Sequence, residues 1–155
     1  VTECIINENT KVICDSAFSS CNMIQSIVIP AGVKSICDSA FSFCNNLTTI
    51  VIPESVTYIG YYAFSCCYSL NSINIPQNIT AIKNGTFINC TNLKSISIPE
   101  NTRSIGESAL YGCSNLNIIN YGGTKKDWAS IDFYREWNKN SGTYTIYCSD
   151  GIINK

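Results

Sequence analysis

The fold is decided by one stretch of 23 residues, LTTIVIPESVTYIGYYAFSCCYS at positions 47–69, whose plan recurs along most of the chain. Five sets of residues keep this interval. They are Pro30, Pro53, Pro76 and Pro99; Phe18, Phe41, Phe64, Phe87 and Leu110; Cys21, Cys44, Cys67, Cys90 and Cys113; Ile24, Leu47, Leu70, Leu93 and Leu116; and Ile13, Ile36, Ile59, Ile82 and Ile105. A period between 20 and about 29 residues is typical of a leucine-rich-repeat solenoid. The sequence therefore predicts identical coils stacked on one another.

Each unit begins with an alternating strand. In residues 47–52 this alternation points Ile50 into the core and Thr49 outward. Pro53 ends the strand because it has no N–H to donate. A second short extended piece follows at 56–59, and we expect the Ala-Phe segment after it to cross over as a short helical or 3₁₀ turn. The predicted fold class is an α/β-type repeat solenoid, mostly β with such short turns.

Two domains are predicted: leucine-rich repeats over residues 1–121, in about five coils, and a capping segment over 122–155. Glycines at the start of the second segment break the repeat, and residues 124–131 are expected to form a short helix with Thr124 as its N-cap. Residues 143–148 alternate as a strand. Repeat arrays need caps that cover the open core. The expected buried side of this cap comprises Trp128, Ile131, Phe133 and Trp137.

Composition and charge exclude several classes of function. Charged residues make up 14% of the chain and are scattered singly, with a net charge of −1 and no basic stripe. Nucleic acid and anionic membranes are therefore poor partners. No apolar run approaches the roughly 18 residues of a membrane span. Histidine is absent, which removes histidine triads and histidine metal sites. We expect no enzyme activity, no cofactor and no metal.

The start of the sequence already follows the repeat, because Cys4 and Ile6 are in phase with Ile27 and Ile29. We therefore expect a fragment of a longer array that lacks its own signal peptide.

The ten cysteines have two interpretations. Equivalent residues in stacked coils lie about 4.8 Å apart, within the Cα separation that a disulfide allows. Alternatively, the cysteines are small buried apolar groups with a weak S–H donor. No Cys-x-x-Cys motif occurs, and a linear column of thiols cannot surround zinc tetrahedrally.

The unit Leu-x-x-Ile-x-Ile-Pro-x-x-Val-x-x-Ile-x-x-x-Ala-Phe-x-x-Cys-x-x resembles the BspA-like subclass of leucine-rich repeats. It occurs at 47–69, 70–92 and 93–115, and the resemblance covers about residues 4–121. The tail at 121–128 is similar to the one that ends many such arrays. Departures are Asn7 in place of proline and Leu110 in place of phenylalanine. The resemblance implies a cell-surface protein that adheres to host extracellular matrix or to other cells, with no shared catalytic residues.

Two surfaces are candidate binding sites. The first is the outward face of the strands, where solenoids commonly bind partners; its residues are Thr49, Val51, Ser72, Asn74, Ser95 and Ser97. The second comes from comparing copies, because one coil carries tyrosines where the others carry mostly small polar residues; these are Tyr58, Tyr61, Tyr62 and Tyr68. Exposed tyrosines suit interfaces because they give a large contact area at low entropy cost.

The predicted function is a non-enzymatic protein-binding or adhesion module, monomeric, at the cell surface or secreted, whose partner is a protein of the host surface or matrix. Two alternatives stay open: an intracellular scaffold or effector of the same architecture, and the targeting array of a larger enzyme.

Overall fold

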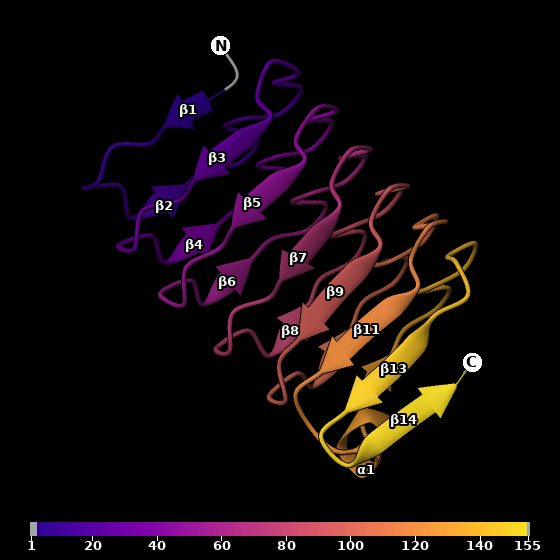
Figure 1. Ribbon diagram of the computed structural model, residues 1–155. Coiled ribbons are helices and arrows are strands. Elements are labelled where there is room, and N and C mark those ends of the chain that lie inside the picture. The colour runs from indigo at the N-terminus through magenta and orange to yellow at the C-terminus, as the bar shows by residue number, and fades with distance from the viewer. Residues whose placement is uncertain (1–2, 155) are drawn as a thin grey trace.

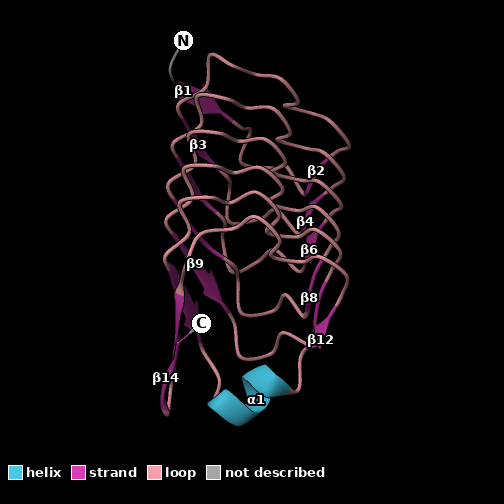
Figure 2. Cartoon of the chain, turned by 90° about the vertical axis from the view of Figure 1, so that its right-hand side faces the viewer, coloured by secondary structure: helices cyan, strands magenta, loops and turns pink. Residues whose placement is uncertain are grey.

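The computed structural model describes residues 3–154 as a leucine-rich-repeat solenoid, which confirms the predicted fold class. The coils are stacked along one axis (Figure 1), and each of them contributes a strand to either side of the stack (Figure 2). Most strands are two to four residues long. The helical cap lies at the C-terminal end of the stack (Figure 2).

The front row of strands is parallel except at its end. It comprises β1 (Glu3–Ile5), β3 (Ser26–Val28), β5 (Thr49–Val51), β7 (Ser72–Asn74), β9 (Ser95–Ile98), β11 (Ile118–Tyr121) and β13 (Thr145–Cys148), with β14 (Gly151–Asn154) antiparallel to β13. The register follows the sequence interval, because Ile27 pairs with Ile50 and Ile73 with Ile96. In β5, Ile50 is buried while Thr49 is exposed, as the alternation predicts.

The back row is shorter. It comprises β2 (Val12–Ile13), β4 (Ser35–Ile36), β6 (Tyr58–Ile59), β8 (Ala81–Ile82), β10 (Ser104–Ile105) and β12 (Asp132–Phe133), all parallel where they pair. Within the described residues both rows are interrupted at the same place: β5 does not pair with β7, and β6 does not pair with β8. We call this interruption the seam. It separates the tyrosine coil (residues 47–69) from coil four (residues 70–92).

The core is a column of phenyl rings between the two rows of strands. Neighbouring rings stack almost in parallel, with centroids 5.2 Å apart for Phe18 and Phe41, 5.4 Å for Phe41 and Phe64, and 5.6 Å for Phe64 and Phe87. Leu110 continues this column and is also fully buried. Each ring is therefore covered by the rings of adjacent coils, and no coil buries its core alone.

The crossover after each back strand is a run of tight turns. In the tyrosine coil the Ser65 N–H donates to Tyr62 O within the coil, whereas the Phe64 N–H donates to Thr86 O of the next coil. Because alternate N–H groups bond to the next coil, no continuous helix forms in the crossover, where a helical or 3₁₀ turn was expected. The bonds that stay within the coil join residues three apart, as in a 3₁₀ turn. Two residues of this turn, Tyr62 and Cys66, adopt the left-handed backbone, with φ of 56° for both.

The column cysteines lie behind these turns. Cys44, Cys67, Cys90 and Cys113 are fully buried. Each thiol donates to the carbonyl oxygen of a phenylalanine in the coil before, as the Cys67 thiol does to Phe41 O at 3.1 Å. All ten cysteines are free thiols in the structure. The column cysteines thus have the role of small buried groups with a weak donor, one of the two interpretations from sequence.

The C-terminal segment covers the last coil. Helix α1 (Lys125–Ala129) begins after Thr124, whose hydroxyl accepts from the Asp127 N–H at 3.1 Å while the Asp127 carboxylate accepts from the Thr124 N–H at 3.0 Å. Hydrogen bonds from Thr124 lower the pKa of Asp127. The side chain of Trp128 is buried, and its ring meets Tyr121 edge-on at 5.2 Å. The predicted helix and N-cap are confirmed; β14, which pairs with the predicted last strand, was not anticipated.

Candidate binding site

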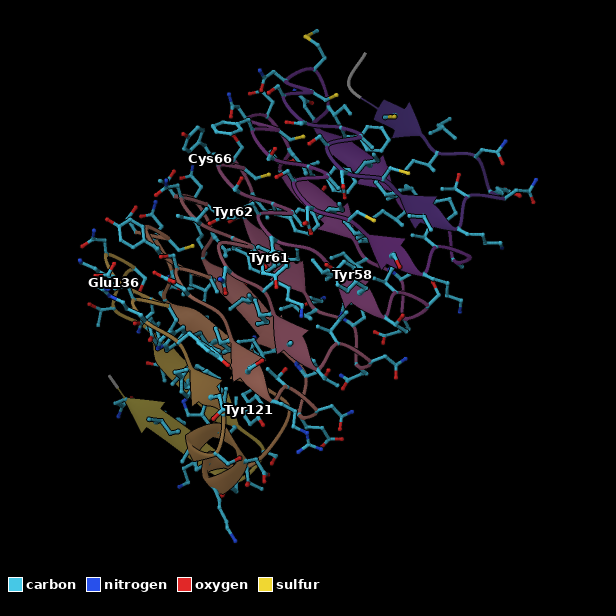
Figure 3. All side chains as sticks on the ribbon, turned by 180° about the vertical axis from the view of Figure 1, so that it is seen from behind. Tyr58, Tyr61, Tyr62, Cys66, Tyr121 and Glu136 are labelled. Atoms are coloured by element: carbon cyan, nitrogen blue, oxygen red, sulfur yellow. The ribbon has the colours of Figure 1, made fainter. Side chains whose placement is uncertain are left out.

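The four tyrosines of the tyrosine coil are all exposed, with 37% of Tyr58, 41% of Tyr61, 46% of Tyr62 and 39% of Tyr68 accessible. Figure 3 shows Tyr58, Tyr61 and Tyr62 following one coil across the back of the molecule. They come from β6 and from the turn after it. The six candidate residues of the strand face lie on the front row, so the two candidate surfaces are on different sides of the solenoid.

Tyr58 and Tyr61 are brought together by two charged neighbours. The Lys83 Nζ lies 6.0 Å from the ring centroid of Tyr58 and 5.8 Å from that of Tyr61, distances at which a cation is attracted to a ring face. On the other side, Asp38 Oδ1 accepts from the Tyr61 N–H at 2.9 Å and from the Tyr58 hydroxyl at 3.4 Å. Partial burial, with a further contribution from Asp38, raises the pKa of Tyr58.

Tyr62 and Tyr68 lie farther along the coil. Gly85 leaves room for the Tyr62 ring, because a Cβ on Gly85 would lie 2.2 Å from Tyr62 Cε1. A hydrogen bond between the side chains of Tyr68 and Cys66 raises the pKa of Tyr68. The structure thus places Tyr58 and Tyr61 in one cluster around Lys83 and holds Tyr62 separately against the next coil.

A groove beside this cluster was not predicted. It has a volume of about 240 Å³ and is lined by Tyr61, Ala81, Ile82, Lys83, Asn84, Ser104, Gly106 and Tyr134. Lys83 could have been found by comparing copies, because the same repeat position holds Cys37, Gly60 and Gly106. Tyr134 could not have been found in this way, because α1 lengthens the last repeat. Ile105 pairs with Phe133, whereas the 23-residue interval predicts that it pairs with Trp128.

The strand face is less uniform than the sequence suggests. Thr49, Ser72 and Asn74 are exposed, but Ser95 and Ser97 are half-buried. Val51 belongs to an exposed apolar row, because it is paired with Val28, which is paired in turn with Ile5. Their exposed fractions are 74% for Val51, 64% for Val28 and 88% for Ile5.

Groups of metal-ligating side chains and reactive thiols are two further kinds of site to consider in the described part of the chain. Residues 3–154 contain no group of three or more His, Cys, Asp or Glu side chains that could hold a metal ion. Burial raises the pKa of the Cys44 thiol to about 11 and of the Cys113 thiol to about 12, the opposite of what a thiolate nucleophile needs. Over the same residues, no helix is both long and apolar enough to cross a membrane.

Comparison with known proteins places this fold among the BspA-type leucine-rich repeats. The family model of the BspA-type leucine-rich repeat region matches residues 3–138 in six copies. A leucine-rich cell surface protein from Faecalibacterium prausnitzii is 35% identical over 85% of this chain, with a TM-score of 0.83. The chain spans 35% of the length of that protein. No curated protein matches the chain.

Two more distant solved structures share the fold alone. The pneumococcal vaccine antigen PcpA is 19% identical, with a TM-score of 0.70 over 100% of this chain and 42% of its own. The leucine-rich repeat protein of T. pallidum is also 19% identical, with a TM-score of 0.69 over 89% of this chain and 78% of its own.

Proposed function

Because the chain belongs to the BspA-type leucine-rich repeat family, we propose that it is a non-enzymatic protein-binding module of a cell surface, and that the tyrosine coil makes the contact. The relative from Faecalibacterium prausnitzii, described as a cell surface protein, supports this location. In this proposal the module acts as a monomer, the repeats over residues 1–121 present the surface, and residues 122–155 close the stack.

The proposal rests on four exposed large side chains of one coil that the fold does not need. The corresponding position of Tyr58 is Ser35 in the preceding coil, and that of Tyr62 is Ser39, so small residues satisfy the same backbone. The tyrosines remain between 37% and 46% exposed. Rigid aromatic side chains of this kind dominate the binding energy of protein interfaces. Adhesion to a host matrix protein is the form of binding that we propose.

Replacing Tyr58, Tyr61, Tyr62 and Tyr68 together by serine tests this contact. We expect the affinity for a matrix protein, found by screening a panel of purified extracellular-matrix proteins, to fall at least about tenfold, since interface tyrosines often contribute more than 1 kcal/mol each. Surface plasmon resonance measures the affinity, and circular dichroism checks that the solenoid is intact.

The matched control loads the other candidate surface with charge, by Thr49→Lys, Ser72→Lys and Asn74→Lys. Loss of binding in this control with full binding by the serine variant would move the contact to the strand face. A second variant, Gly85→Ser, keeps all four tyrosines but fills the space under the Tyr62 ring, where a Cβ would lie 2.2 Å from Cε1. We expect it to weaken binding through the displaced ring, because serine itself fits this left-handed position at Ser39 and Ser108.

A further inference from the structure

The seam leaves backbone donors without partners next to the groove. At the repeat position of Lys83, the Gly60 and Gly106 N–H groups each donate to the coil before at 2.8 Å. Across the seam the Lys83 N–H makes no such bond within residues 3–154, and neither does the Thr80 N–H. A second hollow of about 90 Å³ opens there and shares Ala81 and Lys83 with the groove. A backbone N–H without a partner in the protein is available to donate to a ligand oxygen or to water.

Side-chain donors converge on the same place. Lys83 is held between the Tyr58 and Tyr61 rings and forms no ion pair among the described residues. The Oδ1 of Asn84 is already used, because it accepts from the Glu107 N–H at 3.1 Å. Its NH₂ group makes no hydrogen bond within residues 3–154, so two N–H donors remain. The groove floor is therefore rich in donors and carries one positive charge.

Aromatic rings stand at both ends of the groove. Tyr61 belongs to the tyrosine coil, and Tyr134, which is 56% exposed, follows β12 three coils away. At about 4.8 Å per coil the two positions are about 14 Å apart along the stack. A pyranose ring is similar in length to one such spacing, so a short chain of sugar rings would span the groove.

We propose that this groove binds an oligosaccharide that carries uronate groups, lying along the stack across the tyrosine coil and the coils after it. The Lys83 ammonium pairs with a carboxylate, and the Asn84 amide donates to hydroxyl or carboxylate oxygens. Tyr61 and Tyr134 present ring faces to the C–H faces of terminal sugars. Hydroxyl groups can also accept from the Lys83 N–H, which has no backbone partner within residues 3–154.

An acidic peptide is the competing ligand, and the direction of the groove disfavours it. A peptide that binds by strand addition pairs with an exposed strand edge and runs parallel or antiparallel to the strands. This groove runs across the coils, from Tyr61 through Lys83 and Ser104 to Tyr134, so a peptide backbone in it would cross the strands and pair with none of them. A sugar chain has no such directional requirement.

The test measures binding of tetragalacturonate by isothermal titration calorimetry to the chain and to two variants. Lys83→Met removes the charge but keeps the apolar stem, and we expect at least a tenfold lower affinity. Asn84→Asp keeps the Oδ1 acceptor, which Asp38 supplies at the same repeat position to the Tyr61 N–H, but it exchanges the NH₂ donor for a negative charge. We expect this variant to lose measurable binding while remaining folded.

The controls separate the sources of binding. Lys94→Met removes an exposed lysine ahead of β9 on the front side and should leave the affinity unchanged. Fully methyl-esterified tetragalacturonate should bind at least tenfold more weakly than the acid. Equal binding of acid and ester, unchanged binding in both groove variants, or stronger binding of tetraglutamate than of the sugar would each overturn the proposal. The groove variants keep all four tyrosines, so we expect them to bind a matrix protein as the unchanged chain does. The proposed protein contact and the proposed oligosaccharide site can therefore fail independently.

Discussion

Replacing Phe64 by alanine is expected to lower the free energy of unfolding by about 3–5 kcal/mol, the range for truncating a buried phenylalanine. Phe64 is fully buried and stacks on a ring at each side, with centroids 5.4 and 5.6 Å away. Its removal therefore leaves a cavity in mid-stack and breaks two aromatic contacts. Because stability in solenoids comes from contacts between adjacent coils, the loss falls on two interfaces at once. Urea denaturation followed by circular dichroism measures it.

Two other substitutions calibrate this result. Phe18→Ala removes the same group at the end of the column, where the ring is only half-buried and stacks on Phe41 alone, so it should cost clearly less. Phe64→Leu introduces the residue that Leu110 provides at the same repeat position and should cost less than half as much as alanine. Equal losses for Phe64→Ala and Phe18→Ala would mean that stacking does not hold the coils together.

The sequence predicts the solenoid well because burial in it is strictly periodic. The repeat position of Ile50 must face the core in every coil. One alternating stretch with a fixed interval therefore sets both the strand direction and the register. The same regularity makes exceptions visible, which is how Tyr58 and Tyr61 were identified. Their neighbour Lys83 belongs to the next coil and is close only after stacking.

Other features leave no comparable signal in the sequence. The left-handed turn positions are occupied by Tyr62 and Cys66 in one coil and by Gly85 and Asn89 in the next, so the usual glycine signature is missing. The seam is a place where strands of adjacent coils do not pair, and no single residue type specifies it. Tyr134 reaches the groove because α1 is inserted ahead of it, and this shifts the last repeat out of phase with the others.

Alkaline unfolding is the second large effect that we expect. Burial raises the pKa of Cys113 to about 12 from its ordinary value of 9.0, and burial also raises the pKa values of Cys67 and Cys90. The folded chain therefore keeps these three protons at a pH where the unfolded chain releases them. Stability is fully present below about pH 9 and is lost as the pH rises toward the folded pKa values.

The size of this loss decides the outcome. Each thiol costs about 1.4 kcal/mol per pH unit between its unfolded and its folded pKa, so the three buried thiols together cost on the order of several kcal/mol by pH 11. This loss is of the same size as the stability of a typical domain, which is about 5–15 kcal/mol. We expect cooperative, reversible unfolding between about pH 9 and 11, measured by circular dichroism with excess phosphine reductant.

The matched variant is Cys67→Ala with Cys90→Ala and Cys113→Ala. It should be less stable at pH 7, because the carbonyl oxygens of Phe41, Phe64 and Phe87 lose their thiol donors, yet its stability should fall less steeply above pH 9. Tyrosine and lysine ionise in both proteins and cancel in this comparison. An equally steep loss in the variant would assign alkaline unfolding to those surface groups. A shallower one would show that the buried column must stay neutral, and hence that a thiolate in it is incompatible with stacked coils.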